Sequence, residues 1–192
     1  MKNTAMTSDI LKEIGYFSSQ DIEVFERSLI KRTVRKGDIL LKQGQVCQTV
    51  YFIAKGAFIE YNFKDEIEQN IIDLYTDNEW LLNKQSFVRQ EPSETIIEAF
   101  IESDVFELDI HKIHHLVAQS PAFLRLGSIL EPTHSRILFF DNSFSPLQKY
   151  QHILENRKEI LQAFPLKIIA SYLKITPETL SRVREKITKR LS

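Results

Sequence analysis

The chain has 192 residues, of which 43% are hydrophobic and 27% are charged, and its formal net charge is −1. This composition excludes the disordered and fibrous classes and is that of an ordinary globular protein. No apolar run approaches the roughly 18 residues of a membrane helix, and the first residues lack a signal core, so we expect a cytoplasmic protein without a membrane partner. Cys47 is the only cysteine, which excludes an internal disulfide and a four-thiolate metal cluster.

The near-neutral net charge hides an uneven distribution. Residues 166–192 contain seven basic and two acidic side chains, whereas acidic side chains outnumber basic ones in the rest of the chain. A basic end on an acidic body suits local attraction to a polyanion. The same pattern also fits a solvated amphipathic helix, and charge alone does not separate the two interpretations.

The first predicted element is a short amphipathic helix at residues 18–30. Ser18 and Asp21 form a capping signal, and Ile22, Phe25 and Leu29 fall on one helical face. After this helix the residue pattern changes from helical to strand-like at Thr33.

Residues 33–109 have the pattern of short antiparallel strands. Their β-branched and aromatic runs are broken at Gly37, Gly44 and Gly56, about every ten residues. We predict a small all-β unit here, either a barrel or a jelly roll.

After Asp109 the pattern becomes helical. The run "IHKIHHLVAQS" predicts one helix, Pro121 marks the start of the next, and Pro132 should kink that second helix. Apolar side chains then follow at alternating spacings of three and four, which suits a partner helix. This predicted dimer seam consists of Phe123, Leu126, Leu130, Thr133, Ile137 and Phe140. The stretch "DNSFSP" breaks the helix, and "LQKYQHILENRKEILQ" forms another.

Three segments follow from this pass along the chain. Residues 1–120 hold the roll and its N-terminal helix, 121–143 form a dimerisation helix, and 144–192 form a helical C-terminal unit. The fold class is therefore α+β.

The C-terminal residues predict two helices joined by a tight turn. Leu166–Leu173 form the first, Lys174 and Ile175 the turn, and Thr176 with Pro177 supplies an N-cap and a first-turn proline for the second. The second helix would bury Leu180, Val183 and Ile187. This arrangement is typical of a DNA-binding helix-turn-helix, although two packed amphipathic helices with a polar outside would look similar.

The outward side chains of the second helix suit recognition of double-stranded DNA. Arg182 can donate two hydrogen bonds to a guanine, and Glu178 can accept from a cytosine amino group. Thr176, Thr179 and Ser181 suit phosphate oxygens. The predicted contacts to the phosphate backbone of DNA also include the cations Lys174, Lys186, Lys189 and Arg190.

The order of these parts resembles the cyclic-AMP receptor protein/Fnr (Crp/Fnr) family of bacterial transcription regulators. The strongest matches are "VRKGDILLKQGQVCQTVYFIAKGAFIEYNF" in the roll and "IIASYLKITPETLSRVREKI" at the end. The resemblance implies a cyclic-nucleotide-binding-like roll and a homodimer that reads a palindromic operator without catalysis, and RNA polymerase is a candidate protein partner. We expect one departure from the family, the lack of a β-hairpin wing after the recognition helix, because the sequence ends at Ser192.

A second departure lies in the predicted ligand pocket. The family's Gly-Glu pair falls on Leu82 and Asn83, and its Arg-Ser pair falls on Ser93 and Glu94. Glu94 would bring negative charge toward a phosphate, and two like charges about 4 Å apart repel by about 4 kcal/mol at intermediate dielectric. Arg89 is a substitute cation in a connecting loop, and Trp80 with Leu82 would fill the roll interior. We therefore expect no cofactor and no cyclic AMP bound in the usual mode.

Two further interpretations stay open. One is a regulator that responds to a different small effector or cyclic nucleotide through a rebuilt pocket, and the other is a roll-containing adaptor that no longer binds DNA specifically. His111, His114 and His115 share a helix, but no acidic or thiolate cluster joins them apart from Asp109, so we predict no metal site and no enzyme.

Overall fold

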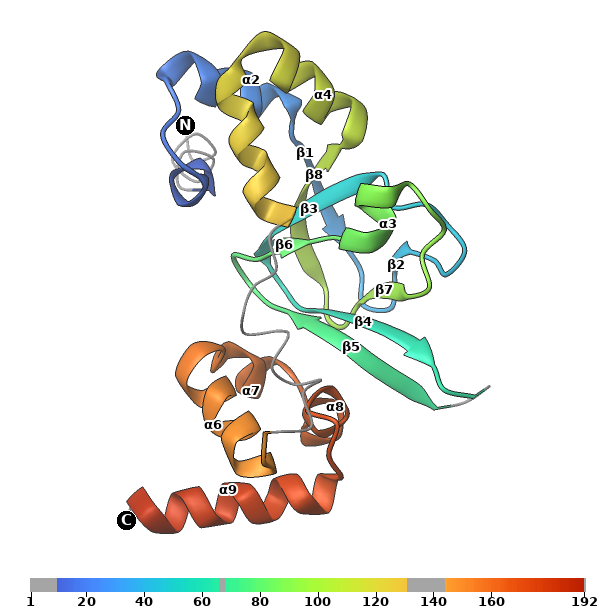
Figure 1. Ribbon diagram of the computed structural model, residues 1–192, viewed down its shortest axis with the longest axis vertical. Helices are drawn as coiled ribbons and strands as arrows, with labels where there is room; N and C mark the ends of the chain where they lie inside the picture. Colours follow the sequence, from blue (N-terminus) through green and yellow to red (C-terminus); the bar gives the residue numbers. More distant parts are fainter. Residues whose placement is uncertain (1–9, 66–67, 131–143, 192) are drawn as a thin grey trace.

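A β-roll forms the middle of the molecule, with helices at both of its ends (Figure 1). The computed structural model describes residues 10–65, 68–130 and 144–191. The roll consists of eight strands: β1 (Ile30–Val34), β2 (Ile39–Leu41), β3 (Thr49–Lys55), β4 (Phe58–Phe63), β5 (Gln69–Tyr75), β6 (Trp80–Leu81), β7 (Ile96–Ala99) and β8 (Ser103–Asp109). They form two four-stranded sheets, ordered β1-β8-β3-β6 and β2-β7-β4-β5, in which the neighbours are antiparallel. The predicted antiparallel roll is confirmed.

The glycine positions that broke the sequence pattern lie between strands. Gly37 and Gly44 follow β1 and β2 with φ angles of 86° and 84°, a left-handed conformation that glycine adopts without steric cost. Gly56 joins β3 to β4, where a Cβ atom would stand 2.0 Å from the Ser103 hydroxyl oxygen. A side chain at this position would therefore push β8 away from the turn.

Helices α2 (Ser19–Ser28) and α4 (Ile110–Gln119) cover one end of the roll, as the sequence predicts. The Ser18 side chain and Asp21 form the expected capping box at the start of α2. Asp109 caps α4 by accepting a hydrogen bond from the Lys112 backbone N–H. Both helices therefore begin where local capping chemistry places them.

The segment after α4 differs from the predicted dimerisation helix. Pro121–Leu130 form a 3-10 helix (η1), and Phe123 is 1% exposed and Leu126 is 5% exposed within the roll's own core. Phe123 stacks near Phe17 and Phe25, with ring centroids 5.6 and 6.3 Å apart. Because a 3-10 helix repeats every three residues, Phe123, Leu126 and Ile129 share one face.

The predicted seam is therefore wrong at its first two positions, which face the roll and not a partner. Leu130 is partly buried against the same core. Thr133, Ile137 and Phe140 lie outside the described residues, so their part of the seam stays a prediction.

Four helices cover the opposite end of the roll: α6 (Pro146–Asn156), α7 (Glu159–Ala163), α8 (Leu166–Tyr172) and α9 (Pro177–Leu191). The sequence predicts one helix over the region of α6 and α7, but the helix is interrupted at Arg157, which leaves the helical conformation. Helix α9 lies at the outer edge of this unit, away from the roll (Figure 1).

The described residues form two hydrophobic clusters. One fills the roll and its N-terminal helices, and the second joins β4 and β5 to the C-terminal helices. The second cluster includes Ile71 and Leu74 from β5, Tyr150 and Ile153 from α6, and Leu180 from α9. The roll and the helical unit therefore share a core. Among the described residues, none of the helices is long and apolar enough to cross a membrane.

Candidate functional site

The C-terminal helix pair lies close to its predicted position. Helix α8 ends at Tyr172, a short turn follows, and α9 begins at Pro177. The hydroxyl oxygen of Thr176 accepts a hydrogen bond from the Thr179 backbone N–H at 3.2 Å, so Thr176 is the N-cap. Leu180 and Val183 are buried in the shared cluster, with Ile187 partly buried against it. Both helices therefore lie where the sequence predicts them, and their use as a helix-turn-helix stays a prediction.

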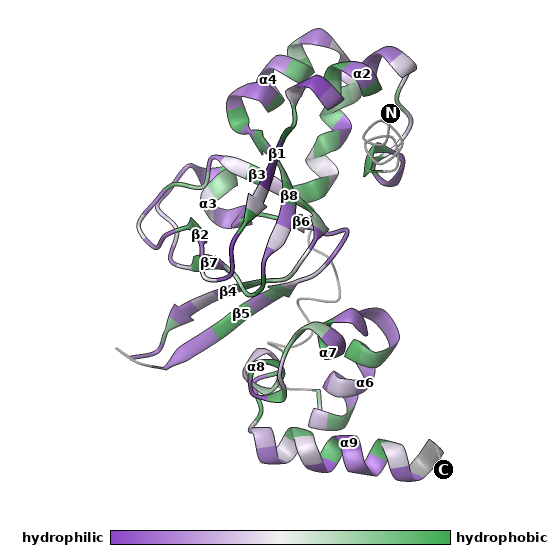
Figure 2. Ribbon diagram, turned by 180° about the vertical axis from the view of Figure 1, so that it is seen from behind, coloured by the Kyte–Doolittle hydropathy of each residue, from purple (hydrophilic) through white to green (hydrophobic). Residues whose placement is uncertain are grey.

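The outer face of α9 is polar and exposed. Glu178, Ser181 and Arg182 are exposed, and within the described part of the chain the Arg182 guanidinium makes no hydrogen bond. A hydrogen bond from its own backbone N–H lowers the pKa of Glu178, which is therefore ionised at neutral pH. Hydrophilic and hydrophobic residues alternate along α9 in Figure 2. This face can present donors and acceptors to an external partner.

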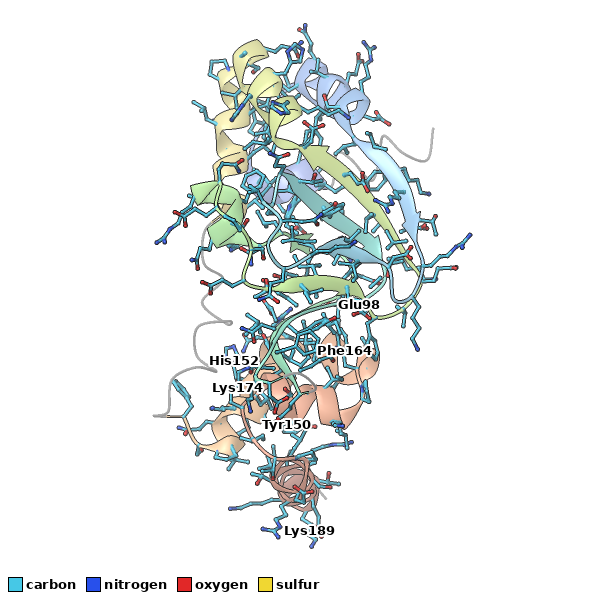
Figure 3. All side chains as sticks on the ribbon, turned by 90° about the vertical axis from the view of Figure 1, so that its right-hand side faces the viewer. Glu98, Tyr150, His152, Phe164, Lys174 and Lys189 are labelled. Atoms are coloured by element: carbon cyan, nitrogen blue, oxygen red, sulfur yellow. The ribbon has the colours of Figure 1, made fainter. Side chains whose placement is uncertain are left out.

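The predicted cations separate into two groups. Lys186 and Lys189 are exposed on α9, where Lys189 pairs with Glu185 at 2.7 Å. Lys174 instead turns toward the roll: its ammonium donates to the Asn70 side-chain oxygen at 2.8 Å and to the Ile71 carbonyl oxygen. Figure 3 shows Lys174 beside the roll and Lys189 at the far side of the helical unit. The prediction of a phosphate contact by Lys174 is therefore wrong for this arrangement.

A cavity of about 400 Å³ opens beside β4, β5 and α3 (Lys84–Arg89). The four positions that the sequence assigns to the degenerate pocket, Leu82, Asn83, Ser93 and Glu94, line this cavity together. Two other predicted members do not line it. Trp80 packs edge-on against Phe52 with ring centroids 5.3 Å apart, and Arg89 is exposed at the end of α3.

A buried carboxylate forms part of this cavity wall. Glu60 is 6% exposed, and its carboxylate accepts hydrogen bonds from Tyr75, Asn83 and Thr95 at 2.9, 2.9 and 2.6 Å. Burial raises the pKa of Glu60. Asn83 also caps α3, because its side-chain oxygen accepts from the Ser86 backbone N–H at 2.8 Å. The sequence prediction missed Glu60, whose partners are 15 to 35 residues away.

Acidic side chains outnumber basic ones in the lining of this cavity. Its charged side chains are Glu60, Asp73, Glu94 and a single cation, Lys84. A bound phosphate would approach more negative than positive charge, and like charges repel strongly in a partly buried site.

A polar network connects the cavity wall to the helical unit. Asp73 lines the cavity and also lies 3.4 Å from the Arg157 guanidinium. Arg157 is 6% exposed and donates further hydrogen bonds to the Leu74 carbonyl, Tyr172 and Glu79 at 2.6, 2.7 and 2.8 Å. The sequence pattern does not single out this residue, because it lies within a segment that the pattern predicts to be one continuous helix.

The three predicted surface histidines, His111, His114 and His115, are exposed on α4. His115 lies 3.0 Å from the Gln119 side-chain nitrogen. Within the described ranges, His, Cys, Asp and Glu residues nowhere gather in a group of three that could hold a metal.

Comparison with known proteins concerns mainly the roll. Residues 31–120 match the family model of the cyclic nucleotide-binding domain. A search of curated protein sequences gave no match. The matched residues cover the roll from β1 to the end of α4, and the helical unit lies outside them.

Solved structures extend the likeness to most of the chain. FixK2 from Bradyrhizobium japonicum is 13% identical with a TM-score of 0.66, covering 84% of this chain and 85% of that chain. A putative cyclic nucleotide binding protein from Ruegeria pomeroyi is 17% identical with a TM-score of 0.63, covering 97% and 87%. The Thermus thermophilus Catabolite Activator Protein is 14% identical with a TM-score of 0.51, covering 91% and 85%. These likenesses show the fold.

Proposed function

We propose that this protein is a DNA-binding transcription regulator of the Crp/Fnr type, in which α8 and α9 form a helix-turn-helix. The observation that carries the proposal is the outer face of α9. Glu178, Ser181 and Arg182 are exposed there, while Leu180 and Val183 on the opposite face are buried in the core. The fold that this chain shares with the Catabolite Activator Protein supports the same reading.

The chemistry of this face suits base edges in a major groove. The guanidinium of Arg182 can donate two parallel hydrogen bonds to a guanine, and the ionised Glu178 can accept from a cytosine amino group. Thr179, Lys186 and Lys189 are placed along the same helix to contact phosphates, which position the protein without specifying sequence. Thr176 caps the helix, so its hydroxyl is engaged within the chain.

The regulator is proposed to act as a homodimer. Two α9 helices related by a two-fold axis would enter successive major grooves, with half-sites about 10 base pairs apart. The dimer contacts are proposed to involve the seam positions Thr133, Ile137 and Phe140, which lie outside the described residues. Phe123 and Leu126 are not part of this proposal, because they are buried inside the roll. RNA polymerase remains a candidate partner.

The roll is proposed not to bind cyclic AMP in the usual mode. The carboxylates of Glu60, Asp73 and Glu94 around the cavity support this part of the proposal. The size of the cavity, about 400 Å³, favours a second candidate, a regulator that responds to a different small effector.

Selection from a random duplex library tests the proposal. The full chain should enrich a palindromic sequence with two half-sites about one helical turn apart. If the enriched pool shows no common sequence while the chain binds it, the chain is better described as an adaptor with a basic surface. A selected sequence without two-fold symmetry would overturn the dimeric mode.

A further inference from the structure

The helix pair covers the open edge of the sheet at β5. In the order β2-β7-β4-β5, β5 is an edge strand, and an uncovered edge exposes unpaired backbone groups. Both backbone polar groups of Ile71 are hydrogen-bonded to this helix pair. Its N–H donates to the Ser171 hydroxyl oxygen at 3.3 Å, and its carbonyl oxygen accepts from the Lys174 ammonium. Side chains from α8 and its turn therefore take the place of a neighbouring strand.

Lys174 has an unusual backbone for this task. Its φ angle is 57°, in the left-handed region that disfavours residues with a Cβ atom. Its ammonium is also partly buried beside β5, and this burial lowers the pKa of Lys174 to about 8, helped by the nearby Lys64 and Lys149. Lys174 thus combines a left-handed backbone at the turn with a side chain that donates hydrogen bonds to the roll.

Arg157 provides a second, more deeply buried anchor. It ends α6 and reaches the loop after β5, where Glu79 accepts two hydrogen bonds at 2.8 and 3.0 Å. Asp73 lies on the other side of the guanidinium, and the Leu74 carbonyl accepts from it at 2.6 Å. These bonds have fixed directions, whereas the hydrophobic contribution of the shared cluster is non-directional.

We infer that Arg157 and Lys174 are positioning residues for DNA recognition, which fix the helix pair on the β5 edge and so set the direction in which each roll presents α9. This inference rests on the proposed function. Neither side chain reaches the outer face of α9, and both bond to strand or loop residues of the roll. In a two-fold dimer the relative position of the two rolls then determines the separation of the two α9 helices.

The test uses substitutions on the roll side, which leave the sequence of the helix pair unchanged. Asn70→Ala removes the side-chain acceptor of Lys174, and Glu79→Gln removes the charge that faces Arg157. Matched controls are Asn62→Ala, which removes a hydrogen bond from Asn70 at 2.9 Å, and Glu107→Gln, which weakens the Arg32 pair on the other sheet.

The first readout is the dependence of affinity on half-site spacing. Duplexes carry the sequence selected by the wild-type protein, with zero or five base pairs inserted at the centre. Five base pairs turn the second half-site to the opposite face of the helix, so the wild type should lose roughly 100-fold in affinity. The Asn70→Ala/Glu79→Gln variant should lose about tenfold or less, with its preference for the half-site bases unchanged. The Asn62→Ala/Glu107→Gln variant should behave as the wild type.

The second readout needs no DNA. Hydrogen exchange of the Ile71 amide and of α8 should be faster in the Asn70→Ala/Glu79→Gln variant and unchanged in the control variant. Equal exchange in the two variants would overturn the inference. Unchanged spacing discrimination would also overturn it while leaving the proposed function intact. A wild-type protein that selects no sequence at all would instead remove the proposed function.

Discussion

The cavity of the roll and the outer face of α9 both carry polar side chains, but they use them differently. In the cavity the donors of Tyr75, Asn83 and Thr95 converge on one carboxylate, Glu60. On α9, Glu178 and Arg182 are exposed to solvent. A polar group that is satisfied inside the chain stabilises the fold, whereas one that faces water is available to a partner. The two regions should therefore respond in opposite ways to substitution.

The largest expected effect is on stability, at Glu60. Glu60→Met keeps an unbranched side chain but removes the acceptor of three hydrogen bonds, which should lower the free energy of unfolding by about 2 kcal/mol. Glu94→Met, at the exposed rim of the same cavity, should change it by less than about 0.5 kcal/mol. Urea denaturation of both variants measures the difference. Equal stability of the two variants would show that the Glu60 cluster is not structural.

The next effect is on DNA affinity, at Arg182. Arg182→Ala should leave stability unchanged and cost about 1–3 kcal/mol of affinity for the selected operator, with little change on scrambled DNA. Arg184→Ala is the matched control, because two residues along a helix turn the side chain about 200° away. Binding titrations on both duplexes measure this. Equal weakening on operator and scrambled DNA would show that Arg182 does not read bases.

A pH-dependent effect is expected at the boundary between the roll and the helix pair. The pKa of Lys174 is lowered to about 8 in the folded chain from an ordinary value of 10.5. Between these two pH values the unfolded chain holds the proton more often, so the free energy of unfolding should rise with pH through this window. Denaturation of the wild type and of Lys174→Met at pH 7 and pH 10 measures it. A difference between the two proteins that does not grow with pH would contradict burial of the ammonium.

Lys189 should contribute a modest and non-specific term. Lys189→Ala removes one phosphate contact and should reduce the slope of log affinity against log salt by about one unit. The exposed Glu185 pair is worth little, so stability should not change. Lys42→Ala, on an exposed turn of the roll, should leave the slope unaltered. A slope that falls equally in both variants would place the DNA elsewhere on the surface.

The smallest effect concerns the cavity itself. A nucleotide at 100 times its dissociation constant would stabilise the fold by about 2.7 kcal/mol. Because carboxylates outnumber cations around the cavity, millimolar cyclic AMP should produce no change in the thermal midpoint of the chain. A clear rise in the thermal midpoint with cyclic AMP, made larger by Glu94→Lys, would identify the cavity as an anion site. It would contradict a cavity whose carboxylates repel phosphate.

The elements that the sequence predicts well are those set by local chemistry. Gly37 and Gly44 mark turns, Ser18 with Asp21 caps α2, and Thr176 caps α9. In each case the residues that decide the structure are within a few positions of one another. The same holds for the polar face of α9, because helical spacing alone separates Arg182 from the buried Leu180.

The features that the sequence does not predict depend on distant partners. Phe123 and Leu126 read as a dimer seam, but Phe17 and Phe25 bury Phe123 within the chain. Arg157 lies in an apparently continuous helix and is turned out of it by acceptors more than 75 residues away. Lys174 counts as a cation for DNA until the fold places β5 beside it. The spacing of residues along the sequence does not indicate partners that are this far apart in the chain.

The most direct test is the ratio of the affinities of the wild-type chain for its selected operator and for a scrambled duplex, measured at one physiological salt concentration without any nucleotide. The exposed face of α9 predicts a ratio of about 1,000 or more. A ratio near one would contradict the central claim that Glu178, Ser181 and Arg182 read a DNA sequence.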